Sequence, residues 1–392
     1  MADGLVPAGN DNAEGLPSFH SPEVQTQNPN DWEERVDLKI KAYLLEHSVE
    51  YRQLNELRHQ GWNNPAGDSY FKKQRQQSDT ADEKVAQIFY KMMQKIAQEM
   101  HQKTDGALAI KKDSGNDSAI LDMCMAPGGF LLTTMNINPG ARALGITLPV
   151  SEGGYKVLLP ECLNVSYKFL DVNMLASDMG VRYISLGRPD ADEFLPHQFR
   201  PTDAFDLVMC DGQVLRTQER AAYREHREAI RLTVDQLALG LEHLRPGGTM
   251  IILLHKAERP KSVGLFYTFR KFSSVKLFKP TKYHTKRSSY YMVVTDVQSQ
   301  HPEALAAVGT WKKQWEAATF GTNDEFEEAL HGEEFDVAKI LEDFGPEFVE
   351  MGREVWATQA RGLSTAPWMK EKKWKRPGKN RRLDMRRGTV AD

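Results

Sequence analysis

The chain has 392 residues, 40% of them apolar and 27% charged, and a formal net charge of −3. These proportions are typical of a globular protein and exclude wholesale disorder. No run of about 18 apolar residues occurs, so we expect no membrane-spanning helix, and the polar N-terminus predicts no secretion signal. Three cysteines without paired spacing argue against a disulfide framework and a metal site. We therefore expect an intracellular protein of the nucleus or cytoplasm.

The first part of the chain predicts a disordered arm followed by helices. Residues 1–30 mix Gly, Pro, Asn, Asp and Ser without any period. From Asp31 the residues Val36, Ile40 and Leu44 recur at helical spacing. A second amphipathic helix begins near Thr80, which can form a capping box with Glu83. Residues 31–115 are thus predicted to form a helical N-terminal extension.

Between residues 116 and 298, short apolar strands alternate with helices. The expected strands are Ile120–Cys124, Ala143–Thr147, Val165–Leu170, Phe205–Cys210, Met250–Leu254, Val275–Phe278 and Tyr290–Val294. A long helix is predicted from Glu219 to Leu244. This alternation predicts an α/β fold with a Rossmann-like, doubly wound and mainly parallel sheet, which binds ligands at the carboxyl ends of its strands. The closely spaced last two strands predict an antiparallel hairpin at one edge.

The C-terminal part predicts more helices and a basic tail. Residues 299–368 are predicted to form a helical extension of several short helices, interrupted by Gly321, Gly332 and Gly345-Pro346. Residues 369–392 form a basic tail, in which ten Lys and Arg but only two acids occur between Lys370 and Arg387. Such a tail fits nucleic-acid binding, a nuclear-localisation signal or a solvated end, and composition alone does not separate these.

The segment Leu121–Phe130 carries the clearest chemical signal. It predicts a strand that runs into a turn with the paired glycines Gly128 and Gly129 and then into a helix. Glycines allow the backbone to approach a ligand, and the N-terminus of the helix offers N–H groups to a polar or anionic moiety. The segment is not a GxGxxG dinucleotide fingerprint, and the chain has no P-loop.

The string Asp-x-Cys-x-Ala-Pro-Gly-Gly-Phe at Asp122–Phe130 resembles the S-adenosylmethionine-binding motif of FtsJ-type RNA 2′-O-methyltransferases. The resemblance extends over residues 70–296, roughly. It implies a methyltransferase sheet, S-adenosylmethionine as cofactor and a ribose 2′-hydroxyl of RNA, of the ribosomal RNA type, as substrate. It also implies that the cofactor is bound by Asp122, Ala126, Pro127, Gly128, Gly129, Phe130, Asp171 and Asp211.

The same resemblance implies a catalytic Lys-Asp-Lys-Glu tetrad, which this chain matches only in part. Asp211, after the strand Phe205–Cys210, matches the catalytic Asp, and Lys72 matches the first lysine. The second lysine position holds Leu253, and the terminal glutamate position holds Ser289. An acidic residue that often holds the cofactor ribose is also missing after the second strand.

Lys256 is the lysine nearest in sequence to Leu253, which stands at the position of the second lysine. Side chains alternate along a strand, so His255 shares a face with Leu253 while Lys256 points to the other face. Only a bend or bulge at the strand end would bring Lys256 to Asp211. We predict a catalytic group of Asp211, Lys256 and Lys72, and we interpret His255 as a strand-end or core histidine.

Basic and aromatic residues predict contacts with RNA. The Lys279–Arg287 loop combines lysines, a histidine and an arginine with Tyr283, which suits phosphate contacts and base stacking. The basic tail, together with Trp368 and Trp374, could add affinity in the same way. Two alternatives stay open. The incomplete tetrad also fits a catalytically retired methyltransferase fold that binds RNA or a protein. A third interpretation keeps the enzyme but replaces RNA with a small hydroxylated metabolite. The oligomeric state stays unknown.

Overall fold

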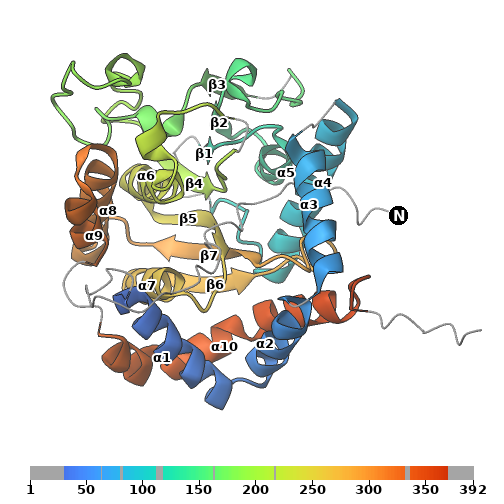
Figure 1. Ribbon diagram of the computed structural model, residues 1–392. Coiled ribbons are helices and arrows are strands. Elements are labelled where there is room, and N and C mark those ends of the chain that lie inside the picture. The colour runs from blue at the N-terminus through green and yellow to red at the C-terminus, as the bar shows by residue number, and fades with distance from the viewer. Residues whose placement is uncertain are drawn as a thin grey trace, which may run out of the picture.

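The computed structural model describes residues 31–62, 64–79, 83–111, 118–161, 164–215, 218–331 and 336–369. The predicted arm, Thr80 of the capping box and the tail from Lys370 lie outside these ranges. The described residues form a seven-stranded sheet of order β3-β2-β1-β4-β5-β7-β6 (Figure 1). Its strands are β1 (Ala119–Met123), β2 (Arg142–Thr147), β3 (Val165–Phe169), β4 (Phe205–Cys210), β5 (Leu244–His255), β6 (Ser274–Phe278) and β7 (Ser289–Val297).

The sheet confirms the predicted fold class. Strands β3, β2, β1, β4 and β5 are paired in parallel, whereas β7 lies antiparallel between β5 and β6. The predicted hairpin is therefore present, with β6 at the edge. Most strand ends agree with prediction within three residues, but β5 begins six residues before Met250. A register irregularity between Gly248 and Met250 lets the Pro-Gly-Gly segment join the strand.

Helices cover both faces of the sheet because strand residues alternate between two cores. Ile120 belongs to the core under α4 (Glu83–Lys103) and α5 (Gly129–Ile137). Its neighbour Leu121 belongs to the core on the opposite face. That face is covered by α6 (Glu228–Glu242), α7 (Pro260–Phe269) and α8 (Pro302–Phe320), and α9 (Asn323–His331) packs on α8. Within the described residues, no helix is long and apolar enough to cross a membrane.

Three of the remaining helices gather at the β6 edge (Figure 1), namely α1 (Asp31–His47), α2 (Val49–Trp62) and α10 (Val337–Ser364). Helix α3 (Pro65–Asp79) follows α2 and rises away from that edge. Helix α10 contacts β6, α7, α1 and α2. Arg58 of α2 pairs with the buried Glu258 at 2.5 Å and donates to Gln359 of α10 at 2.8 Å. The helical additions thus cover the edge of the sheet, while the exact boundaries of the central domain stay a prediction.

Two helix predictions were wrong. Helix α6 begins at Glu228 instead of Glu219, because the preceding residues form a short 3-10 turn that sends Arg224 to Asp171 and Glu228. Helix α10 continues through Gly345-Pro346, where a break was expected. Pro346 lies on the exposed side of α10, and Gly345 packs against Tyr43, so the buried face of the helix outweighs the local cost of proline.

Candidate active site

The turn between β1 and α5 presents a helix N-terminus at the carboxyl edge of the sheet. Cys124 has φ 70° and Gly128 has φ 99°, so the chain reverses sharply before α5 starts at Gly129. Gly128 is the N-cap residue and has no side chain to accept from the first turn. Backbone N–H groups at this end of α5 are therefore suited to a polar ligand group.

The two glycines of this turn also satisfy packing requirements. A Cβ atom on Gly129 would overlap the carbonyl oxygen of Tyr90 on α4, and a Cβ on Gly128 would lie 2.7 Å from Leu159 Cγ. The sequence pattern suggested room for a ligand as the reason for these glycines. The structure adds a second reason, because Gly129 lets α4 and α5 approach each other closely.

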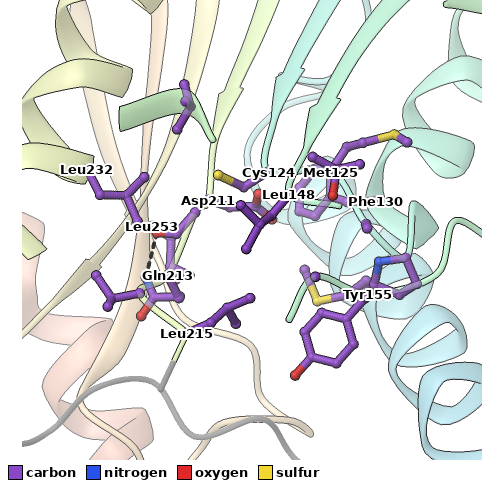
Figure 2. A pocket seen from close by; sticks show the side chains of 18 of the residues that line it. Cys124, Met125, Phe130, Leu148, Tyr155, Asp211, Gln213, Leu215, Leu232 and Leu253 are labelled. Atoms are coloured by element: carbon purple, nitrogen blue, oxygen red, sulfur yellow. Dashed lines mark hydrogen bonds between the residues drawn. The ribbon is translucent and has the colours of Figure 1, made fainter. Parts of the chain in front are cut away.

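A cavity of about 210 Å³ opens next to this turn. Figure 2 shows Gln213 and Leu253 on one side of it, and Met125, Phe130 and Tyr155 on the other. Most of the predicted cofactor residues line it, namely Ala126, Pro127, Gly128, Gly129, Phe130, Asp171 and Asp211. Thr147, at the position without the expected acidic residue, also lines it.

Asp122 is a second carboxyl close to the half-buried Asp211 and is itself buried. It is 1% exposed, is absent from the residues that line the cavity, and its Oδ1 has no hydrogen-bond partner among the described residues. Burial raises the pKa of Asp211 to about 7. Burial, and then the charge of Asp211, raise the pKa of Asp122 well above its ordinary value. The two carboxyls therefore bind protons more tightly than carboxyls in water do.

Asp171 is held by neighbours that the sequence alone did not suggest. Its Oδ1 accepts from the backbone N–H of Asn173 at 2.9 Å. Its Oδ2 accepts from Arg224 Nη2 at 2.8 Å and from Gln218 Nε2 at 2.9 Å. Arg224 is itself buried and pairs with Glu228 at 2.6 Å. These contacts fix the orientation of Asp171 at the cavity wall and compensate its charge.

The structure does not bring the predicted catalytic lysines to Asp211. Lys72 is exposed on α3. The buried Gln74 of the same helix accepts a hydrogen bond from Arg287 at 3.0 Å. Residues 72 and 74 face nearly opposite sides of a helix, so Lys72 points away from Arg287. Lys256 follows β5 with φ 51° and does not line the cavity. The pleat of β5 turns His255 toward the cavity instead. Among the described lining residues, none is a lysine.

Polar side chains that were not predicted to act in catalysis form one wall of the cavity. His255 Nε2 lies 2.9 Å from Gln213 Oε1, two residues after Asp211. His284, Arg287 and Ser289 complete this wall. The strand alternation already placed His255 on the face of Leu253, and that signal was sufficient to find it. Nothing in the local sequence pointed to His284 in preference to its neighbours.

The Lys279–Arg287 loop is a less open basic surface than predicted. Lys279 is 4% exposed, and its Nζ donates to the carbonyl oxygens of Arg287 and Ser289 at 2.7 Å and of His284 at 3.1 Å. Arg287 is also buried. Neither residue therefore forms part of an open basic surface, because Lys279 holds the loop together and Arg287 donates to Gln74 of α3. Lys282 remains exposed.

Trp368, which was considered for base stacking, is buried as well. Its ring packs against Tyr70 at 4.5 Å and against Phe71 at 5.2 Å between centroids. Trp368 thus joins the C-terminal end of the described chain to α3. Within the described ranges, no group of three or more His, Cys, Asp or Glu side chains has an arrangement that could hold a metal ion.

The family model of FtsJ-like methyltransferases matches residues 85–297. Comparison with curated protein sequences gave no match. A solved ribosomal RNA methyltransferase, described as putative, from Plasmodium falciparum is 16% identical, with 52% of this chain and 96% of that chain covered and a TM-score of 0.33. An rRNA methylase from Streptococcus thermophilus is 11% identical, with 51% of this chain and 96% of that chain covered and a TM-score of 0.30. An O-methyltransferase family protein from Burkholderia thailandensis is 11% identical, with 67% of this chain and 72% of that chain covered and a TM-score of 0.31.

Proposed function

The chain belongs to the FtsJ-like methyltransferase family, whose model covers more than half of it, and on this premise we propose that it transfers a methyl group from S-adenosylmethionine to a ribose 2′-hydroxyl of RNA. One observation carries the proposal. The Ala126–Phe130 turn, Asp171 and Asp211 come from three separate strand ends and line one cavity at the carboxyl edge of the sheet. Ligands of open α/β sheets bind at this edge.

The cavity residues fit a donor of this type. S-adenosylmethionine carries a positive sulfonium and a positive amino group. Asp122 is buried and Asp211 is half-buried; the pKa values of both are raised, and a nearby cation would favour their charged forms. The free end of α5 suits the donor's carboxylate. Asp171, held by Arg224, lies at the position that the family resemblance places beside the adenine.

When bound, S-adenosylmethionine supplies an activated methyl group. The residues of this chain then have to align the acceptor oxygen with that methyl group and exclude water. Alignment contributes much of the acceleration when the donor is intrinsically reactive. Asp211 faces the cavity, and the apolar side chains of Leu253, Met125 and Phe130 also line that cavity. This setting strengthens electrostatic interactions at the reacting atoms.

RNA is the acceptor class that the family favours. Exposed cations such as Lys282, and the ten cationic residues of the predicted tail, offer phosphate contacts despite the net charge of −3. We propose a ribosomal-type RNA as substrate, in the nucleus or cytoplasm.

The test measures donor binding and transfer separately. S-adenosylmethionine is titrated calorimetrically into the wild type, Asp211→Ala and the exposed control Asp192→Asn. Methyl transfer from labelled donor to unmodified ribosomal RNA is measured in parallel, and nuclease digestion identifies 2′-O-methylnucleosides. We expect binding by the wild type and the control, and transfer that is lost in Asp211→Ala. Labelled bases instead of riboses would contradict the proposed acceptor atom.

A retired methyltransferase fold is the second candidate. The observation in its favour is that Leu253 replaces the lysine of the family resemblance and that the described cavity wall contains no lysine. Donor binding without transfer to RNA or to small hydroxylated compounds would support this candidate. Failure of the wild type to bind the donor would contradict the enzyme proposal altogether.

A further inference from the structure

The wall of the cavity opposite the β1–α5 turn carries two imidazoles. Strands β5 and β7 pair so that His255 lies opposite Ser289, while Leu253 lies opposite Tyr291. Position 253 lies two residues, about 6.6 Å along the strand, from the level of Ser289, and a lysine side chain there would have to reach across that distance. His255 stands at that level directly, and Gln213 holds its Nε2 at 2.9 Å. A polar layer of Gln213, His255, Ser289 and His284 thus lies beyond Asp211.

His284 is the least satisfied member of this layer. Its Nδ1 lies 3.5 Å from Ser289 Oγ. Its Nε2 is shielded from solvent and has no hydrogen-bond partner among the described residues. An unpaired buried nitrogen costs stability, and groups of this kind in native proteins call for a functional explanation. The side chain borders the same cavity as Asp211.

The backbone holds His284 in place against a conformational cost. His284 has φ 56°, a left-handed conformation that non-glycine residues seldom adopt. Its carbonyl oxygen accepts from Lys279 Nζ and from the backbone N–H of Arg287, both at 3.1 Å. Strained residues that the surroundings hold firmly are concentrated at active sites. The buried Lys279 therefore serves to present the His284 ring.

The groups around His284 keep its ring neutral. Burial lowers the pKa of His284 well below its ordinary value, and the positive charges of Arg287 and Lys279, and then His255 of β5, lower it further. The ring therefore keeps one nitrogen without a proton at neutral pH. The unprotonated nitrogen offers a lone pair to a hydroxyl group that enters the cavity, and the geometry of the side chain at the cavity wall places it there.

We propose that His284 accepts the proton of the hydroxyl that receives the methyl group, with His255 and Ser289 holding that hydroxyl in place; the proposal rests on the proposed function. As the hydroxyl oxygen bonds to the methyl carbon, its proton passes to His284 Nε2. The carbon–sulfur bond breaks, and its electron pair remains on sulfur as a neutral thioether. The imidazolium then releases its proton to water as the products leave.

Glycine at 284 provides a sharp test. Glycine tolerates positive φ, so His284→Gly removes the ring without new backbone strain and leaves space for free imidazole. We expect the single-turnover rate of transfer to unmodified ribosomal RNA to fall about 100-fold or more. The Kd of S-adenosylmethionine should change less than twofold, and added imidazole should restore the rate in proportion to its concentration. His197→Gln, a change at an exposed histidine, is the matched control.

Each outcome decides between the possibilities. A rate within threefold of the wild type in His284→Gly would overturn the proposal. So would a lost rate that imidazole does not restore, because that result indicates a structural role. His284→Gln, which keeps the size of the side chain, should lose the low-pH limb of the wild-type rate profile. A wild-type protein that binds the donor but methylates no RNA would refute the proposed function, and this inference with it.

Discussion

At the scale of single residues, burial decides roles that residue type leaves open. Lys279 and Lys282 lie in the same basic loop and are three residues apart. Lys279 is buried with three carbonyl oxygens around its Nζ, whereas Lys282 is exposed. One lysine therefore stabilises the loop, and the other is available to a phosphate. The sequence describes both residues in the same way.

This difference predicts the effects of replacing each lysine. Lys279→Met should lower the free energy of unfolding by about 3 kcal/mol, because hydrogen bonds from a charged donor are lost and buried carbonyls stay unpaired. Lys282→Met should change it by less than about 0.5 kcal/mol. Urea denaturation followed by circular dichroism measures both. Equal effects of the two changes would contradict the structural role of Lys279.

Asp211 predicts a pH dependence of stability with a defined sign. Its pKa rises from 3.8 to about 7 on folding, so the folded state binds the proton more tightly than the unfolded state. The stability from this proton is fully present below about pH 4 and is lost as pH rises through about 7. Asp211→Asn removes this loss. The melting temperature of Asp211→Asn relative to wild type should therefore increase between pH 5 and pH 8.

Other groups titrate in the same range, so only the difference between the two proteins reports on Asp211. Thermal melts of the wild type and Asp211→Asn at matched pH values supply that difference. A difference that stays constant with pH would show that Asp211 is ionised throughout, and would contradict its raised pKa. Donor binding adds a second check, since a cation beside Asp211 should release its proton.

At the scale of elements, close contacts decide where glycine is required. Helix α4 lies against the start of α5, with the carbonyl oxygen of Tyr90 where a Cβ on Gly129 would be. On α8, by contrast, a Cβ on Gly309 would meet no atom within 4 Å among the described residues. A side chain added at Gly129 would therefore push two helices apart, whereas one added at Gly309 would be accommodated.

Alanine at these two positions tests the contact. Gly129→Ala should destabilise the protein by about 1–3 kcal/mol, because α4 and α5 would have to separate. It should also weaken donor binding, since the same turn lines the cavity. Gly309→Ala should be neutral or stabilise by up to about 1 kcal/mol through helix propensity. Thermal melts and calorimetric titration measure both effects, and a harmless Gly129→Ala would contradict the close approach of the helices.

At the scale of the whole molecule, charge is distributed unevenly. The net charge is −3, although residues 370–387 carry ten cationic side chains and two acidic ones. Removal of residues 370–392 should weaken binding to a ribosomal RNA fragment and make the dependence of log K on log salt less steep, because fewer counterions are released. The Kd of S-adenosylmethionine should not change. Fluorescence anisotropy at several salt concentrations measures the RNA effect, and an unchanged salt slope would contradict RNA binding by the tail.

Much of the fold and one side of the site could be predicted from local patterns. The spacing of apolar residues determined the strands, because the side chains of a strand between two helical layers must be apolar on both faces. The Asp122–Phe130 string determined the β1–α5 turn, because a sharp turn with glycines at fixed places depends on neighbouring residues. Asp211 followed from its place after β4. These features need few distant contacts.

The tertiary structure alone decided which polar side chains meet at the cavity. The pairing of β5 with β7 brought His255 and Ser289 together, and the packing of the Lys279–Arg287 loop buried Lys279 and turned His284 inward. The contact between Asp171 and Arg224 spans 53 residues of chain. Such contacts depend on elements that are distant in sequence, and neither residue type nor spacing encodes them. The sequence by itself therefore determined the family and the β1–α5 turn, and tertiary packing decided which polar side chains line the other wall of the cavity.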